Sequence, residues 1–310
     1  MLVVDNISKL PKNGRPVVLA AGCFDGVHTG HAKVIQTAVQ FARDNSGDAW
    51  IYTFNPHPVK ILSPAVAPEL ITPLELRRRQ FEKTGAAGVI EIPFDTSCAG
   101  IPPEKFLSDL KTGIPALAGI VCGTDWSFGA CAGGTFTMLE KFCAQHGIAA
   151  IAVPAVLSGG ERISSKRIRE LIRAGQLPAA EKLLGHPFCI SGTVIEGNHI
   201  GRELGFPTIN LQSDNELIPA AGVYAARARV QSAASGVQSF SAAVFIGMRK
   251  TFHDDTPVIE AHLLNFSGDL YGQHVELYLI EKIRDIIFFS SREALIEQIG
   301  KDIGRIGQAV

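Results

Sequence analysis

A regular alternation over the first half of the chain restricts the fold most. Short apolar runs rich in β-branched residues alternate there with stretches of helical periodicity, and these runs cover residues 17–21, 50–54, 89–92, 120–122 and 148–153. Such alternation is typical of parallel βαβ units. It predicts a doubly wound, Rossmann-like α/β domain, in which ligands bind outside the carboxyl ends of the strands.

The pattern changes near residue 187. From there, short β-rich segments are separated by Gly, Asn, Asp and Pro, and they cover residues 206–211, 223–230, 242–246, 258–264 and 275–279. Spacing of this kind predicts a small antiparallel β-barrel. Only residues 291–302 read as a helix, with Ser291 as its N-cap. The boundary is placed at Gly185-His186-Pro187, which gives domains 1–184 and 185–310.

The charge balance excludes a global electrostatic partner. The 310 residues include 29 Lys and Arg against 30 Asp and Glu, a net charge of −1. No basic field exists to recruit nucleic acid or anionic lipid, so any phosphate site must be local. We therefore expect no nucleic-acid and no membrane partner, while weak association into a homo-oligomer stays open.

Cysteine usage and hydropathy point to the cytoplasm. The six cysteines are scattered without a C-x-x-C pair, which fits neither a zinc cluster nor a disulfide framework. There is also no apolar run of the length that a membrane span needs. The sequence predicts a soluble protein of the reducing cytoplasm.

A turn rich in glycine and histidine stands where the first predicted strand passes into the first predicted helix. It reads G-C-F-D-G-V-H-T-G-H over residues 22–31. Glycine lets the backbone approach a ligand, and N–H groups at a helix N-terminus attract phosphate. His28 and His31 can point at the same phosphates if the helix begins between them. An ordinary glycine turn is the simpler reading, but the strand-to-helix position favours a phosphate site.

Three further blocks follow in order along the first domain. They are T-F-N-P-H-P at residues 53–58, G-T-D-W-S-F-G at 123–129 and I-S-S-K-R-I-R at 163–169. The last block begins an apparent helix, where hydroxyls, backbone donors and cations can hold a leaving pyrophosphate. Alone, it would read as an N-cap followed by a solvated basic face.

Together with the turn, these blocks resemble the FAD synthetase domain of bacterial bifunctional riboflavin kinase/FAD synthetases, within the nucleotidyltransferase superfamily. The resemblance implies that His28 and His31 are catalytic and contact the ATP phosphates. The ATP-binding residues it implies are Gly22, Phe24, Asp25, Gly26, His28, Gly30, His31, Gly123, Asp125, Ser164, Ser165 and Arg169. The flavin-binding residues it implies in this domain are Asn55, His57 and Pro58.

Two positions depart from the family pattern. Cys23 stands where the family usually has Asn, and Lys166 stands where it usually has Thr. Cys23 removes an amide near the phosphates, whereas Lys166 adds a point charge. These changes leave open whether the adenylylating domain is active.

The richest segment of the second half reads G-N-H-I-G-R-E-L-G-F-P-T-I-N-L over residues 197–211. Thr208 and Asn210 alternate with apolar residues, so on a strand their oxygen-bearing side chains share one face. Such a pair can ligate Mg²⁺ together with nucleotide phosphate oxygens. A polar strand face beside a Gly-Pro turn is the alternative reading.

This segment resembles the riboflavin kinase motif G-x-G-R-x-L-G-F-P-T-A-N, and residues 222–224 and 260–272 resemble the same family. The resemblance implies that Glu260 is the catalytic base for the ribityl 5′-hydroxyl and that Arg284 lies near the flavin, although each could be an exposed surface residue. Lys250 replaces a family Pro in the loop 247–252. The kinase ATP-binding residues it implies are Gly201, Gly205, Pro207, Thr208 and Asn210, with Thr208 and Asn210 as metal ligands.

The resemblance covers nearly the whole chain and implies a bifunctional enzyme of flavin cofactor synthesis. One domain would phosphorylate riboflavin to FMN with ATP, and the other would adenylylate FMN to FAD and release pyrophosphate. The implied partners are riboflavin, FMN, FAD and ATP, with Mg²⁺ as the cofactor of ATP. Two alternatives stay open: an enzyme with only one active domain, and a non-catalytic flavin or nucleotide sensor.

Overall fold

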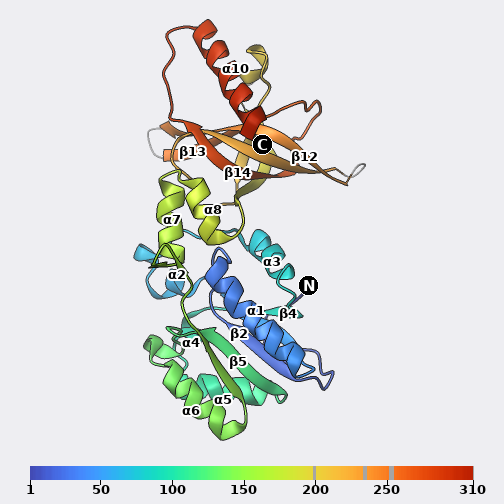
Figure 1. Ribbon diagram of the computed structural model, residues 1–310, viewed down its shortest axis with the longest axis vertical. Coiled ribbons are helices and arrows are strands. Elements are labelled where there is room, and N and C mark those ends of the chain that lie inside the picture. Colours follow the sequence, from blue (N-terminus) through green and yellow to red (C-terminus); the bar gives the residue numbers. More distant parts are fainter. Residues whose placement is uncertain (198–199, 233–235, 251–254, 310) are drawn as a thin grey trace. The chain divides into compact units, whose positions relative to one another are not determined.

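The computed structural model describes residues 1–197, 200–232, 236–250 and 255–309 (Figure 1). They form two compact units, Met1–Glu69 with Leu74–Ser164, and Leu70–Pro73 with Ser165–Val310. Parts of the segment 197–211 and of the loop 247–252 lie outside the described residues, namely Asn198, His199, Thr251 and Phe252. Within the described part of the chain, no helix has the length and hydropathy to cross a bilayer.

The first unit is built on a parallel six-stranded sheet. Its strands are β1 (Leu2–Val4), β2 (Val17–Ala21), β3 (Asp48–Asn55), β4 (Gly88–Pro93), β5 (Leu117–Gly123) and β6 (Ala149–Val153). They lie in the order β1-β4-β3-β2-β5-β6, and every neighbouring pair is parallel. The predicted doubly wound α/β domain is confirmed, and its five predicted strands are all present.

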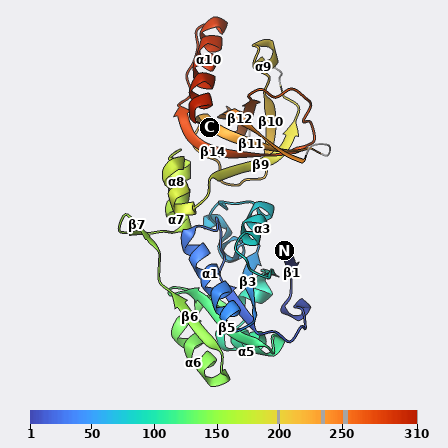
Figure 2. The same cartoon turned by 45° about the vertical axis from the view of Figure 1, so that its right-hand side comes forward.

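Helices cover both faces of this sheet, as Figure 2 lets the reader follow. On one face, α1 (Thr29–Asp44) and α3 (Leu74–Glu82) join a core that includes Ile35, Phe81 and Val18. On the other face, α5 (Pro103–Gly113) and α6 (Phe136–His146) join a core that includes Leu107 and Leu139. The shorter elements of this unit are η1 (Ile7–Lys9), α2 (Pro58–Leu62), η2 (Pro64–Val66), α4 (Thr96–Ala99), η3 (Ala130–Ala132), β7 (Leu157–Ser158) and β8 (Glu161–Arg162).

The second unit contains a closed antiparallel barrel. Its strands are β9 (Phe188–Ile195), β10 (Ile209–Ser213), β11 (Gly222–Ser232), β12 (Gly236–Lys250), β13 (Asp255–Leu263) and β14 (His274–Arg284), in the order β10-β13-β12-β11-β14-β9. Its helices are α7 (Ser165–Arg173), α8 (Leu177–Leu184), α9 (Ile200–Glu203) and α10 (Arg292–Ala309). The predicted small β-barrel with a C-terminal helix is confirmed.

Three details of this unit differ from the prediction. The strand predicted over residues 206–211 begins only at Ile209, because Phe206 closes a turn with its N–H on the carbonyl of Gly201 at 2.8 Å, and Pro207 has no N–H. The short helix α9 precedes it in place of a loop. Strand β9 was not predicted, since its sequence F-C-I-S-G-T-V-I carries a central Gly that weakens the strand pattern.

The division between the compact units falls between Ser164 and Ser165, so α7 and α8 belong to the second unit. Helix α8 packs against β9 and β14 of the barrel. It ends at Leu184, where Gly185 follows with the left-handed φ of +79° that is common after a helix. A helix therefore ends at the predicted boundary, and the assignment of domains 1–184 and 185–310 stays a prediction.

Candidate active sites

His28 lies within the glycine-histidine turn and is the N-cap of α1, which begins at Thr29. Its Nδ1 accepts a hydrogen bond from the backbone N–H of His31 at 3.2 Å, which leaves Nε2 to carry the ring proton. The rings of His28 and His31 are stacked, with centroids 3.5 Å apart and an interplanar angle of 17°. The predicted start of the helix between the two histidines is confirmed. Two imidazoles at a helix N-terminus can donate to an anion.

The backbone of the turn has positive φ angles at three residues before the first histidine. Gly26 has a φ of +81°, and the non-glycine residues Phe24 and Val27 have φ values of +53° and +39°. The ring of Phe24 is buried and meets His31 edge-on at 5.4 Å, so it anchors the turn in the core. A side chain at Gly30 would crowd the ring of His28, because a Cβ there would lie 3.1 Å from its Nδ1.

The other predicted blocks of this unit reach the same edge of the sheet. Asn55 ends β3 and Gly123 ends β5, and these two strands are the parallel neighbours of β2. From β2 the chain proceeds to β3 and β4 on one side and to β5 and β6 on the other, so this edge is a topological switch point. Ligands bind at such points in open α/β sheets. The structure thus brings the turn and the blocks at 53–58 and 123–129 together.

Within these blocks the side chains have defined partners. His57 caps α2, accepting the N–H of Val59 on its Nδ1 at 3.3 Å, and Pro58 is the first residue of that helix. Asp125 is half exposed and pairs with Arg162 of β8 at 2.6 Å. Arg162 was not selected from the sequence, because one arginine on a short hairpin is typical of a surface charge. The ion pair between Arg162 and Asp125 was therefore not predicted from the sequence.

The block at residues 163–169 is divided between the two units. Ser164 closes the first unit, whereas Ser165 begins α7 in the second. Arg169 is one of the buried residues of α7. The predicted helix start at these serines is confirmed, and their contribution to an ATP site stays a prediction.

Cys23 lies at the start of the turn, and burial raises the pKa of its thiol to about 11. At neutral pH the thiol is therefore protonated and uncharged. The nearby charge of Arg77 lowers this pKa and that of Asp25 raises it, but burial is the largest of the three effects. Position 23 supplies a neutral, weakly polar group where the family pattern has an amide.

On the barrel, Glu260 and Asn210 are direct cross-strand partners. Strands β10 and β13 pair Asn210 with Glu260, and β12 and β13 pair Phe245 with Glu260. The adjacent Ala261 is buried, and Phe245 packs in the cluster of α10 with Ile306, which places Glu260 on the outer face of the barrel wall. Cross-strand partners have Cβ atoms about 4.5–5.5 Å apart, so the carboxylate and the amide can act on one ligand.

The loop before β10 folds closely around glycines. A Cβ at Gly197 would lie 2.0 Å from Nδ2 of Asn210, and one at Gly201 would lie 3.0 Å from Oγ1 of Thr208. Gly205 has a left-handed φ of +87°. The motif's glycines therefore let the chain pass against the two predicted metal ligands.

His262 fixes the end of the same loop. Its Nδ1 lies 2.7 Å from the carbonyl oxygen of Pro207, and its ring meets Phe206 edge-on at 5.8 Å. Thr208 directly precedes β10 and is not itself in the strand, so the shared face of Thr208 and Asn210 stays a prediction.

The donor set near Glu260 fits a hard cation held mainly by a nucleotide. Among the residues that the structure describes, no group of three or more His, Cys, Asp or Glu is arranged to hold a metal. Thr208 and Asn210 offer neutral oxygen ligands, which suit a small cation that keeps ligands from water and phosphate. Soft-metal chemistry has no ligands in this set.

Arg284, predicted near the flavin, ends β14 and is held by α10. Its Nη2 lies 2.8 Å from Oδ2 of Asp302, and both side chains are largely buried. Its guanidinium also lies 5.9 Å from the ring centre of Phe289. The structure therefore gives Arg284 a packing role between barrel and helix, and its flavin role stays a prediction. Asp302 was not selected from the sequence, because a lone Asp in a C-terminal helix reads as solvent-exposed.

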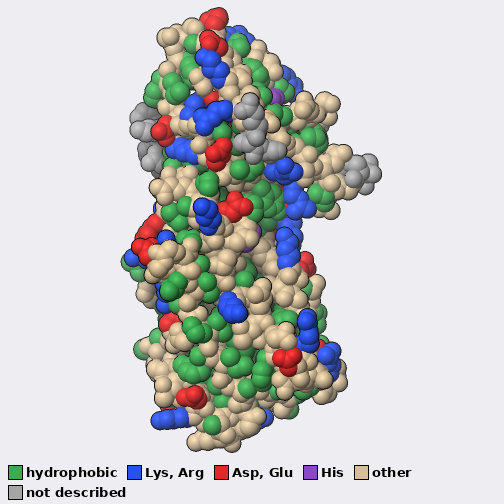
Figure 3. All heavy atoms as spheres, in the orientation of Figure 1, with side chains coloured by type: hydrophobic (Ala, Val, Ile, Leu, Met, Phe, Trp, Pro, Cys, Tyr) green, Lys and Arg blue, Asp and Glu red, His purple; other side chains and the backbone are tan. Residues whose placement is uncertain are grey.

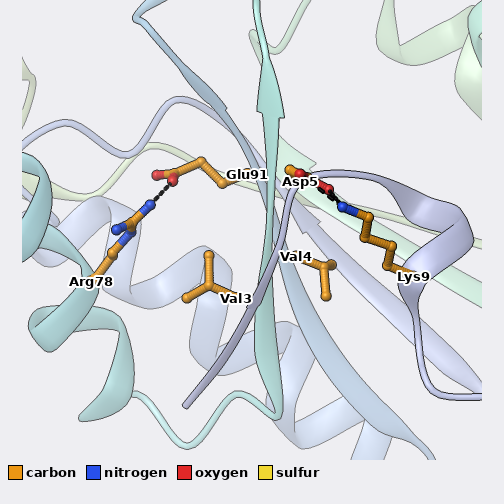
Figure 4. A pocket seen from close by; sticks show the side chains of 6 residues that line it. All are labelled: Val3, Val4, Asp5, Lys9, Arg78 and Glu91. Carbon is orange, nitrogen blue, oxygen red and sulfur yellow. Dashed lines mark hydrogen bonds and ion pairs between the residues drawn. The ribbon is translucent and has the colours of Figure 1, made fainter.

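A small pocket in the first unit lies apart from all predicted residues. It has a volume of about 180 Å³ and is lined by Val3, Val4, Asp5, Lys9, Arg78 and Glu91 (Figure 4). Its charged side chains already pair with one another, Lys9 with Asp5 and Arg78 with Glu91. None of them was a predicted site residue.

Comparison with known proteins shows the family to which the chain belongs. The FAD synthetase family model matches residues 10–167, and the riboflavin kinase family model matches residues 184–310. The two units thus join a FAD synthetase domain to a riboflavin kinase domain. A bifunctional riboflavin kinase/FMN adenylyltransferase from Escherichia coli (strain K12) is 34% identical over 299 residues, which cover 96% of this chain and 94% of the relative. The chain belongs to the family of bifunctional riboflavin kinase/FMN adenylyltransferases.

Other relatives agree across the length of the chain. The protein of the same description from Bacillus subtilis (strain 168) is 34% identical over 92% of this chain and 90% of its own length. A crystal structure described as a macrolide-efflux protein from Streptococcus pneumoniae matches with a TM-score of 0.86 and 29% identity, over 98% of this chain and 97% of that one. The architecture of both units is therefore shared with a solved protein.

Proposed function

We propose that the chain catalyses two successive reactions: phosphorylation of riboflavin to FMN by ATP, and adenylylation of FMN to FAD with release of pyrophosphate. The observation that carries this proposal is that both family domains are present in one chain, over residues 10–167 and 184–310. We place the enzyme in the cytoplasm, with riboflavin, FMN, FAD and ATP as its only partners apart from any weak self-association.

For adenylylation, the glycine-histidine turn is the phosphate site. An oxygen of the FMN phosphate attacks the α-phosphorus of ATP, and the bond to pyrophosphate breaks. The Nε2–H of His28 and the ring of His31, at the N-terminus of α1, stabilise the charge that develops on the phosphate oxygens. This role is supported by the cap that orients His28 and by the stacking of the two rings. Asn55, His57 and Pro58 at the end of β3 hold the flavin substrate.

For phosphorylation, Glu260 is the base. It accepts the proton of the ribityl 5′-hydroxyl while that oxygen attacks the γ-phosphorus of ATP and ADP leaves. Asn210 beside it and Thr208 before β10 orient the nucleotide phosphates, and Gly201, Gly205 and Pro207 shape the loop around them.

Kinase and adenylyltransferase domains of this kind generally use a divalent metal with ATP, and we propose Mg²⁺. Thr208 and Asn210 would hold it together with the phosphate oxygens, since both are hard oxygen ligands. When bound, the ion neutralises phosphate charge and fixes the geometry of the transferred group.

A product assay tests the proposal. Purified protein is incubated with riboflavin, ATP and Mg²⁺, and flavins are separated by chromatography over time. We expect FMN to appear first and FAD to follow, with ADP and pyrophosphate as the second products. Accumulation of FMN alone would support the alternative of one active domain, which the Cys23 and Lys166 departures leave open. Tight flavin binding with no product would support a sensor.

A further inference from the structure

A buried arginine lies behind the phosphate-binding turn. Arg77 belongs to α3, and its side chain is only 3% exposed. Its Nη1 lies 3.4 Å from the carbonyl oxygen of Cys23, and its Nη2 lies 3.5 Å from that of Phe54. The rigid fork of a guanidinium suits this bridging of two fixed acceptors. Arg77 thus joins the turn to the block at the end of β3.

The carbonyl of Cys23 lies where the backbone of the turn changes direction. It directly precedes Phe24, whose φ of +53° is unfavourable for a residue with a side chain. Backbone of this kind persists only where its surroundings hold it. The same carbonyl also accepts the hydroxyl of Thr53 at 3.1 Å, and Thr53 is fully buried. Two side-chain donors therefore converge on the atom that sets the direction of the turn.

Arg77 is itself fixed by a carboxylate on the sheet. Glu91 of β4 is buried and accepts from Nη2 of Arg77 at 3.3 Å. Its other oxygen pairs with Arg78, the next residue of α3, as Figure 4 shows. Arg78 pairs in addition with Glu75 at 2.6 Å, and among the described residues its hydrogen bonds and ion pairs go to these two glutamates rather than to the turn. Arg78 therefore shares the carboxylate of Glu91 with Arg77 but not the two carbonyls, so it is the control for loss of an arginine beside Glu91.

We infer that Arg77 is a positioning residue for adenylylation. It holds the carbonyls of Cys23 and Phe54, so that the N–H groups and histidines of the turn face the nucleotide phosphates while the flavin-binding block keeps its place beside them. The inference rests on the proposed adenylyltransferase function. It assigns Arg77 no contact with substrate.

Steady-state kinetics of Arg77→Met and Arg78→Met test the inference. Because the turn binds the ATP phosphates, its displacement should raise the KM for ATP in FMN adenylylation by about tenfold in Arg77→Met, as loss of a charged hydrogen bond would. Arg78→Met should stay within about twofold, and Arg77→Lys should recover part of the loss. A smaller folded fraction would lower kcat and leave KM unchanged. Riboflavin phosphorylation in each preparation reports on the second domain.

Thr53→Val removes the second donor to Cys23 with little change of volume, and it covers the case in which Arg77→Met does not fold. We expect a rise of about fivefold in the same KM. The inference is wrong if Arg77→Met folds and matches Arg78→Met, or if Arg77→Met fails to fold and Thr53→Val keeps the wild-type KM. A wild-type protein that does not adenylylate FMN would instead refute the proposed function.

Discussion

At the residue that begins α1, one imidazole combines two properties. Nδ1 of His28 accepts the N–H of His31 and so caps the helix, while Nε2 carries the ring proton that we propose is donated to a phosphate. The first property stabilises the fold, and the second is the one that the proposed adenylylation mechanism needs. Substitutions that keep the first and remove the second separate them.

We expect His28→Ala to lower FMN adenylylation by about 10²–10³, the usual effect of removing one donor to a developing oxyanion. His28→Asn should lose a similar amount although Asn is a good N-cap. The measurement is FAD formation from FMN and ATP, with riboflavin phosphorylation by the same preparation as the control. Full activity in His28→Asn would show that His28 acts only as a cap.

Glu260 is the corresponding residue in the kinase domain. Glu260→Gln keeps the size of the side chain and its place opposite Asn210, and it removes the basic carboxylate. We expect riboflavin phosphorylation to fall by about 10²–10⁴, the usual contribution of a positioned base. Adenylylation of supplied FMN should be unchanged. Equal loss of both activities would argue against a base confined to the kinase site.

At this scale the sequence predicted residues with a motif and missed those without one. His28, His31, Asn210 and Glu260 were selected because they stand in long patterns with a chemical use. Arg77 stands in L-E-L-R-R-R-Q, where three arginines in a row are typical of solvated surface charges. Only the tertiary fold shows that one of them is buried beneath the turn.

Among the elements, α10 is attached to the barrel by a largely buried ion pair and by an apolar contact. Asp302 is nearly fully buried, and it pairs with Arg284 of β14 and accepts Nε2 of Gln298 at 2.8 Å. Ile306, one turn further, is buried among Val223 and Ile283. The helix is therefore fixed to the barrel by its second half.

We expect Asp302→Ala to lower the free energy of unfolding by about 3 kcal/mol, because it leaves the guanidinium of Arg284 buried without its carboxylate. Glu297→Ala is the control, since Glu297 makes an exposed pair with Lys301 on the same helix and should matter little. Urea unfolding of the full chain measures both. The same stability in the two variants would mean that α10 is not held by this pair.

The strands and helices of the first unit were predictable because their periodicities are clean. In the second unit the prediction was less complete. Within α10, Ile296 near the start is 37% exposed, and the buried positions lie further along at Asp302 and Ile306. Periodicity shows that a helix has an apolar stripe, but the neighbouring strands decide which part of it is buried.

At the scale of the whole molecule, basic and acidic residues nearly balance, with 29 Lys and Arg against 30 Asp and Glu. On the face shown in Figure 3, Lys and Arg side chains are interspersed with Asp and Glu. This distribution accords with the net charge of −1 and with small-molecule partners bound at local sites. In the proposed mechanism, phosphate recognition depends on two local sites of different kinds: a helix N-terminus with two histidines, and Thr208 and Asn210 beside Glu260.

The central claim is that these two sites work independently, each in its own domain. Mixing His28→Ala with Glu260→Gln tests it most directly, with riboflavin, ATP and Mg²⁺ supplied and FAD measured. Each variant alone should make little FAD. The mixture should make it readily, since His28→Ala supplies FMN and Glu260→Gln adenylylates it. A mixture that makes no more FAD than either variant alone would contradict the claim.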